Sequence, residues 1–278
     1  MPDSASFQRN IGDYTIAVLR DGYLALDFGI LVGTDPASAM AALERVGRPP
    51  RPEIDLNTFL IRGRGRTVLV DGGVGALSDT AGRLPAALKD AGVAPAEIDT
   101  ILLTHAHPDH VGGLVGNDGQ ALFSNAEFVI AERERAFWLD DENLNRGGEG
   151  ARPYFMRARD TFAAYGERVR VVSAGEVLPG IVAVPLPGHT AGHTGFRVES
   201  GGDSLLIWGD IAHFPDIQGP NPEVAVMFDQ DRAQAAATRK QVLEMAVVDG
   251  LAVAGMHLNA PGFARVERQS GGFRIVAG

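Results

Sequence analysis

The chain has 278 residues, 45% of them hydrophobic, which is enough to bury the core of one large domain. Its formal net charge of −10 disfavours a nucleic-acid partner, and no apolar run approaches the ~20 residues that span a membrane. It contains no cysteine, which excludes disulfides and thiolate chemistry, and its N-terminus shows no secretory signal, so we expect a cytoplasmic protein.

The first half of the chain alternates apolar runs of strand type with short segments of helical spacing. The predicted elements are two strands joined by an Asp-Gly turn over 13–30, a helix over 35–47, a hairpin over 56–73, a helix over 82–93, and strands over 97–104 and 126–132. Residues 131–168 indicate helical pieces separated by the glycine-rich break "NRGGEGARP".

The second half continues this mixed order. It predicts strands over 168–173, 181–188, 196–200 and 204–210, a long helix over 231–250, and closing strands over 251–257 and 272–277. No repeat or change of composition marks a linker. We therefore expect residues 1–278 to form a single α+β domain, with two sheets covered by helices.

Metal-competent side chains follow the apolar runs. Four such runs end at His105, His189, Asp210 and His257, and a fifth ends at Asp71. Strand ends and the loops after them are the places where a rigid scaffold presents functional groups. The pattern therefore indicates one site assembled from distant parts of the chain.

The segment "THAHPDH" is the most specific of these signals. His105 and His107 are two residues apart, so at an extended strand end both side chains point to one side. This spacing allows them to share one metal ion, while Asp109 and His110 turn toward a second. Burying four such groups without a cation would leave unpaired polar atoms. Imidazole and carboxylate ligands suit two divalent ions, Zn²⁺ first, with Mn, Fe or Co as alternatives.

"THAHPDHVGG", "LPGHTAGHT", "IWGD" and "AGMH" resemble, in order and spacing, the motifs of metallo-β-lactamase-fold hydrolases over roughly residues 55–260. The segment after "WGD" is similar to the methyl parathion hydrolase and lactonase-like branch. The resemblance implies an αββα sandwich of two mixed sheets, and a homodimer to which an extension over 1–50 contributes. It implies one metal held by His105, His107 and His189, a second held by Asp109, His110 and His257, and Asp210 bridging both.

Differences between this sequence and related enzyme families make some candidate reactions more favoured than others. The absence of cysteine and the presence of Asp210 disfavour a β-lactamase, and only 68 residues follow Asp210, too few for the helical domain of a glyoxalase II. Many quorum-quenching lactonases place a tyrosine where this chain has His213. We expect a metal-bridging hydroxide to attack a lactone, an aryl ester or a phosphotriester. Thioester or β-lactam hydrolysis and a non-catalytic metal-binding module are the alternatives.

Further residues receive roles around this centre. Asp109 is expected to carry a proton, Asp210 to fix the metal pair, and His213 to donate to a substrate oxygen. Residues expected to orient the ligands are Asp71, Thr190 and His193. Aromatic and apolar side chains that would line a cleft for a small, uncharged, partly apolar substrate are Phe28, Phe137, Trp138, Phe155, Met156 and Phe214.

Overall fold

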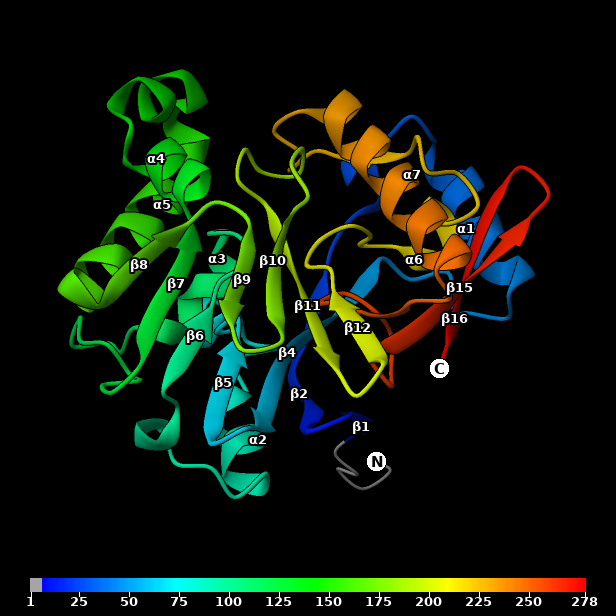
Figure 1. The fold of residues 1–278 in the computed structure, drawn as a ribbon. Coiled ribbons are helices and arrows are strands. Elements are labelled where there is room, and N and C mark those ends of the chain that lie inside the picture. The colour runs from blue at the N-terminus through cyan, green and yellow to red at the C-terminus, as the bar shows by residue number, and fades with distance from the viewer. Residues whose placement is uncertain (1–6) are drawn as a thin grey trace.

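In the computed structural model, which describes residues 7–278, two seven-stranded sheets pack face to face between helices (Figure 1). The first sheet has the order β1 (Gln8–Ile11), β2 (Tyr14–Ala25), β4 (Glu53–Gly63), β5 (Arg66–Val70), β6 (Thr100–Leu102), β7 (Glu127–Ala131) and β8 (Val169–Val172). The second has the order β16 (Gly272–Ala277), β15 (Phe263–Gln269), β14 (Ala252–Ala254), β12 (Asp203–Ile207), β11 (Thr194–Ser200), β10 (Ile181–Pro185) and β9 (Gly175–Leu178). A small sheet pairs β3 (Leu31–Val32) with β13 (Ala225–Val226).

Three hydrophobic layers hold the sandwich together. Strand side chains such as Phe59 and Phe196 fill the space between the sheets. The helices are α1 (Pro36–Arg45), α2 (Leu84–Asp90), α3 (Pro108–Val111), α4 (Glu132–Leu139), α5 (Asp141–Tyr165), α6 (Pro215–Gln218) and α7 (Arg232–Val248). Phe162 of α5 packs on the outer face of the first sheet, and Leu243 of α7 packs on that of the second. This arrangement confirms the predicted αββα sandwich of mixed sheets.

The parallel strands position the functional residues. β5, β6, β7 and β8 run parallel in the first sheet, and β12 and β14 run parallel in the second. The carboxyl ends of parallel strands meet at one edge of a sheet. Asp71 follows β5, His105 comes shortly after β6, Asp210 follows β12 and His257 follows β14. Both sheets therefore deliver these side chains to a common edge.

The Asp-Gly pair predicted as a turn within residues 13–30 is instead a bulge in one continuous strand, β2. The buried carboxylate of Asp21 accepts hydrogen bonds from the backbone N–H groups of Val74 (2.9 Å) and Leu84 (2.8 Å). Gly22 has a φ of +135°, and a Cβ there would lie 2.4 Å from the carbonyl oxygen of Thr80. Long-range partners thus override the local turn signal.

Other differences are smaller. The break within residues 131–168 is confined to Gly148, where the backbone of α5 leaves helical geometry. β1, β9 and β15 lie in segments for which the sequence indicated no strand. β1 and β2 belong to the first sheet, so residues 8–25 are part of the sandwich. Within residues 7–278, no helix combines the length and the apolarity needed to cross a membrane.

Candidate metal centre

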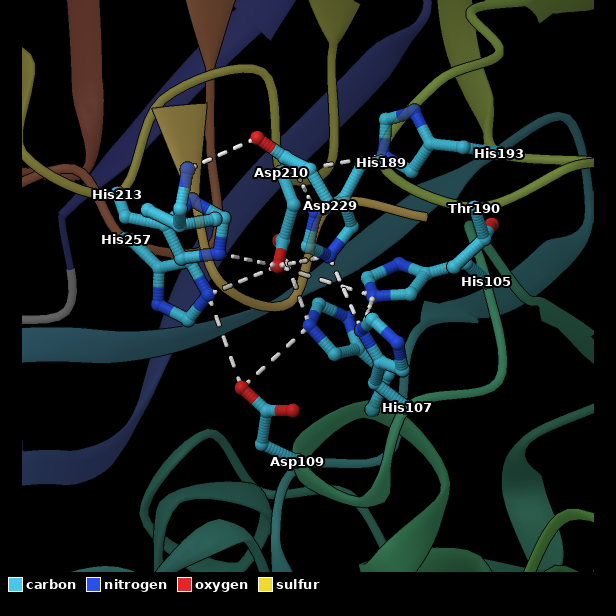
Figure 2. A network of polar contacts seen from close by, with 12 residues as sticks. His105, His107, Asp109, His189, Thr190, His193, Asp210, His213, Asp229 and His257 are labelled. Atoms are coloured by element: carbon cyan, nitrogen blue, oxygen red, sulfur yellow. Dashed lines mark hydrogen bonds and ion pairs between the residues drawn. The ribbon is translucent and has the colours of Figure 1, made fainter. Parts of the chain in front are cut away.

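The seven predicted metal ligands converge on one point at the edge of the sandwich (Figure 2). Their donor atoms form two groups of potential ligands, and the members of each group lie within 4.8 Å of one another. The first group contains His105, His107 and His189. The second contains Asp109, His110, Asp210 and His257.

The first group is a triangle of imidazole nitrogens. Nδ1 of His107 lies 3.0 Å from Nε2 of His105 and 3.0 Å from Nε2 of His189. Nδ1 of His105 lies 3.1 Å from the hydroxyl of Thr104, which leaves its Nε2 directed at the centre. Three converging nitrogens match the donor set that Zn²⁺ and similar ions accept.

The second group is organised by the carboxylate of Asp210. Its Oδ1 lies 3.3 Å from Nε2 of His110, and its Oδ2 lies 3.0 Å from Nε2 of His257. Oδ2 also lies 3.3 Å from Nε2 of His189, in the first group. One oxygen of Asp109 lies 3.6 Å from the Nε2 atoms of both His110 and His257. Asp210 is therefore in contact with both groups, as a bridging ligand must be.

The hydrogen bonds on the far sides of the rings test whether cations fit here. Nδ1 of His110 lies 2.7 Å from Asp71, Nδ1 of His189 lies 2.8 Å from Asp229, and Nδ1 of His257 lies 3.0 Å from the carbonyl oxygen of Asp55. Each Nδ1–H donates outward, so Nε2 is the atom of each ring that faces the centre. These Nε2 atoms face Asp210 oxygens, and Nε2 of His110 and Oδ1 of Asp210 are buried without a hydrogen-bond partner. A divalent metal ion between such atoms would bind both the ring nitrogens and the carboxylate oxygens, so the residues fit divalent metal ions.

The pKa values of the histidines at the centre also fit the binding of a cation. Burial and the neighbouring imidazoles hold the pKa values of His105 and His107 well below the usual range, which favours the neutral, metal-binding form. Burial lowers the pKa of His189, but Asp210 and Asp229 outweigh it and raise that pKa to about 9. The carboxylates thus stabilise positive charge at the centre.

His193 is a positioning residue for Asp210. Its Nδ1–H donates to the carbonyl oxygen of Leu186 (2.9 Å), and its Nε2 accepts the backbone N–H of Asp210 (2.9 Å). Burial, with a smaller contribution from His189, lowers its pKa to about 3, so the ring is neutral. A Cβ on Gly209 would lie 2.3 Å from Nε2 of His193, so glycine is required beside Asp210. Both ring nitrogens are engaged, which leaves none to bind metal.

Asp71 lies where the sequence placed it, behind His110. Its carboxylate also accepts the backbone N–H (2.8 Å) and the hydroxyl (2.7 Å) of Thr104, so one carboxylate orients the strand end before His105. Its φ of +60° is unusual for a residue with a side chain, as is common at functional sites. The hydroxyl of Thr190, which we expected to orient a ligand, donates to Glu134 (2.6 Å) and not to a ligand ring.

The carboxylate of Asp229 lies behind the ring of His189, as that of Asp71 lies behind the ring of His110. Our sequence prediction did not include Asp229. Besides His189, it accepts the backbone N–H of Val226 (2.9 Å), and the buried guanidinium of Arg239 lies 3.8 Å away. The only local signal was a carboxylate in "FDQD", ahead of the long helix α7. Its pairing with His189 spans 40 residues, which no local pattern encodes.

We expect Asp229→Asn to weaken metal binding about 10–100-fold, the usual cost of losing a carboxylate behind a ligand histidine. An amide cannot accept from both His189 and Val226, because one of its two polar atoms is a donor. Titration with Co²⁺ measures the affinity. Asp231→Asn is the control, because Asp231 lies two residues later and caps α7, a role that asparagine fills equally well. Equal affinities for the two variants would contradict the assignment.

His213 lies beside the centre, and its ring stacks on that of His257 with 4.7 Å between centroids and 21° between planes. Its Nε2 is 3.2 Å from Oδ2 of Asp210, and together with His189 these residues form a third group of potential metal ligands. Burial lowers its pKa to about 4, which makes the ring neutral. Its side chain also borders the cavity in front of the centre.

That cavity has a volume of about 580 Å³ and leads directly to the metal-binding groups. Its floor includes His107, Asp109, His189 and Asp210. Its walls are mainly apolar and come from Leu24, Leu26, Ile54, Val74, Leu77, Pro153, Tyr154, Met156 and Phe228, with Arg157 and Asp160 as charged members.

Of the six side chains predicted to line the cleft, only Met156 does so. The other five pack in hydrophobic cores, four of them buried and Phe137 partly buried, because large aromatic rings gain most from burial. Phe28 and Phe214 contact each other with centroids 5.9 Å apart in a separate core, and Phe214 borders another, smaller cavity. Phe137, Trp138 and Phe155 pack between the helices and the first sheet. Trp138 still touches the site, since its ring lies edge-on to His107 at 5.7 Å.

Comparisons with known proteins agree with this geometry. The family model of the metallo-beta-lactamase superfamily matches residues 52–257. A metallo-beta-lactamase domain-containing protein 1 from Xenopus laevis is 28% identical over 174 residues, 59% of this chain. The chain spans 44% and 66% of the lengths of the two curated relatives that it matches.

Two solved structures resemble nearly the whole chain. AidC, a dizinc quorum-quenching lactonase in complex with the product N-hexanoyl-L-homoserine, superposes with a TM-score of 0.92 at 25% identity over 99% of both chains. The hydrolase AbOPH, described as a member of the beta-lactamase superfamily, has a TM-score of 0.93 at 26% identity, covering 100% of this chain and 98% of its own. The family model covers most of the chain. This chain belongs to the metallo-β-lactamase superfamily.

Proposed function

We propose that this protein hydrolyses lactones and other uncharged esters with the help of two divalent metal ions, within the methyl parathion hydrolase and lactonase-like branch. One observation carries the proposal. The carboxylate of Asp210 contacts two groups of inward-facing ligand atoms, and both groups open onto one apolar cavity.

The ligand groups suggest how the metals are divided. His105, His107 and His189 would hold one ion, Asp109, His110 and His257 the other, and Asp210 both. When bound, such a pair lowers the pKa of a water molecule toward ~7 and polarises the bond to be cleaved. Imidazole with carboxylate makes Zn²⁺ the first candidate, and the dizinc centre of AidC supports that choice.

Two side chains are suited to handle protons and the substrate. The side chain of Asp109 is 19% exposed and borders the cavity, so its carboxylate can pass a proton to a leaving group. His213 is neutral and borders the same cavity, where an N–H can donate to a substrate oxygen. Both roles require contact with the reacting ester, which the cavity provides.

The cavity favours a substrate with an apolar part. Leucine, isoleucine, valine, methionine and phenylalanine side chains form most of its wall, and a volume of about 580 Å³ accommodates a medium-sized ligand. Three carboxylates, those of Asp109, Asp160 and Asp210, border it against a single guanidinium, that of Arg157. This balance disfavours polyanionic substrates. The N-hexanoyl-L-homoserine product bound by AidC carries an apolar acyl chain, which a wall of this kind would suit.

A substrate panel measured on enzyme of known metal content tests the proposal. The panel comprises N-acyl homoserine lactones, aryl esters, a phosphotriester, a cephalosporin and S-lactoylglutathione. We expect the lactones or aryl esters to give the highest kcat/KM, and His107→Ala to lose metal and activity together. A preference for the cephalosporin or the thioester would overturn the substrate assignment, and full hydrolysis by metal-free enzyme would overturn the metal assignment.

The apolar wall gives a separate prediction. Met156→Glu is expected to raise KM for a long-chain lactone about 10-fold while changing a short-chain lactone little, because each buried methylene contributes about 0.8 kcal/mol. Steady-state kinetics over a series of acyl lengths measures this effect. Met227→Glu serves as the control, since Met227 is 58% exposed and does not border the cavity. An equal response of both lactones would contradict an acyl site beside Met156.

A further inference from the structure

Glu134, in the first turn of α4, is a fully buried carboxylate outside the set of metal ligands. Within residues 7–278 no lysine, arginine or histidine forms an ion pair with it. Its charge is instead balanced by four hydrogen bonds, from the backbone of Ala106, the indole of Trp138, the hydroxyl of Thr190 and the backbone of Gly192. Hydrogen bonds to a buried charged group are among the strongest in proteins.

The two oxygens of this carboxylate hold two different loops. Oε1 accepts the backbone N–H of Ala106 at 2.9 Å, and Ala106 lies between His105 and His107. Oε2 accepts the hydroxyl of Thr190 at 2.6 Å and the backbone N–H of Gly192 at 2.9 Å, just after His189. The three histidines of the first ligand group are thus fixed through one side chain.

The packing at Gly192 shows how closely the second loop approaches the helix. A Cβ on Gly192 would lie 2.1 Å from the backbone nitrogen of Glu134. The loop after His189 therefore rests directly on the start of α4. Trp138, one turn further along α4, donates to Oε1 at 2.7 Å and lies edge-on to His107.

We propose that Glu134 is a positioning residue that sets the spacing of His189 relative to His105 and His107, and so tunes the affinity of the first ligand group for metal. This inference rests on the proposed metal centre. Without the carboxylate, the N–H groups of Ala106 and Gly192 lose their buried acceptor and the two loops lose their common anchor. The three ring nitrogens would then no longer be held within 3.0 Å contacts.

Glu134→Gln is the decisive variant, because glutamine keeps the volume but replaces one acceptor oxygen with an NH₂ donor. In either orientation of the amide, its NH₂ group faces the backbone N–H of Ala106 or that of Gly192, so one of the two loops loses its acceptor. Co²⁺ titrated into metal-free protein reports both affinity and ligand geometry through its visible absorption. We expect the affinity of one of two Co²⁺ sites to fall about 10–100-fold, with a changed absorption spectrum, while the other site is retained.

Thr190→Val is a milder variant that removes a single donor without changing the shape of the side chain. We expect it to change the spectrum in the same direction and to lower the affinity of the same site several-fold. It decides the question if Glu134→Gln does not fold. In that case a Thr190→Val protein with the spectrum and affinity of the wild type overturns the proposal.

Asp99→Asn is the matched control. Asp99 accepts the backbone N–H of Thr67 (2.7 Å) and the hydroxyl of Thr100 (2.6 Å), at the opposite ends of β5 and β6 from the metal centre. We expect it to lower the melting temperature and leave the Co²⁺ spectrum unchanged. If Glu134→Gln behaves like Asp99→Asn, Glu134 is structural only and the proposal is overturned.

The wild-type titration separates this inference from the proposed function. Wild-type protein that binds two Co²⁺ ions but hydrolyses no ester would overturn the substrate assignment and leave the role of Glu134 standing. Wild-type protein that binds no Co²⁺ would overturn both. A changed affinity in Glu134→Gln, measured against a wild type that binds two ions, supports the positioning role whatever the substrate.

Discussion

Asp210→Ala is expected to lower kcat/KM well beyond the ~100-fold that a residue behind a metal ligand typically costs. The variant removes the one carboxylate among residues 7–278 that contacts both ligand groups. The imidazoles of His110, His189 and His257 would then lose the carboxylate that all three of them face. We expect the metal content, measured by elemental analysis, to fall from two ions per chain to one or none.

Asp203→Asn provides the comparison for this variant. Asp203 is exposed at the start of β12, and Asp210 follows the end of the same strand. The control should keep both metal content and activity. An Asp210→Ala protein that retains two metal ions and more than about one hundredth of the activity would contradict a bridging role.

Removal of metal by a chelator is the second change with a large expected effect. Activity should disappear and return when Zn²⁺ is added. Binding that favours the folded state contributes about 4 kcal/mol when free metal exceeds its Kd about 1,000-fold. Since 1 kcal/mol shifts the melting temperature by roughly 2–4 °C in a domain of this size, we expect the chelated protein to melt ~10 °C lower, as measured by calorimetry.

A second chelation experiment on His107→Ala tests the origin of that shift. A variant that has lost a ligand gains less from metal, so the difference in melting temperature with and without chelator should shrink. An unchanged difference would show that the chelator acts somewhere other than the ligand groups. Loss of activity without any change in melting temperature would contradict a buried metal centre.

Local patterns in the sequence were sufficient to predict two sheets covered by helices and one site built from distant segments, whereas the αββα sandwich and the division of the ligands came from the resemblance to metallo-β-lactamase-fold hydrolases. The hydrophobic periods located most strands, and His105, Asp210 and His257 follow strands whose apolar runs are clear. Each of these residues could be identified from the sequence alone, because it comes shortly after a recognisable apolar run. Their meeting at one edge follows from the parallel strands of the two sheets.

Interactions between distant segments were not predictable in this way. Asp21 forms a bulge where Asp-Gly normally indicates a turn, because its partners Val74 and Leu84 lie 53 and 63 residues away. The sequence around Asp229 and Glu134 did not identify their partners, since these lie on loops brought next to them by folding. The cavity wall was mispredicted for a related reason. Aromatic residue type alone does not distinguish a ring that lines a cavity from one that fills a core.

The position of the ligands at the edge of the sandwich has a mechanical consequence. His105 and Asp109 follow strand β6 of the first sheet, whereas Asp210 and His257 follow strands β12 and β14 of the second. Metal ions held by both sets would act as a cross-link between the sheets, joining residues more than 100 positions apart. Closing such long loops restricts the unfolded chain most strongly. In a protein with no cysteine, the metal centre would therefore provide the constraint that disulfides provide elsewhere.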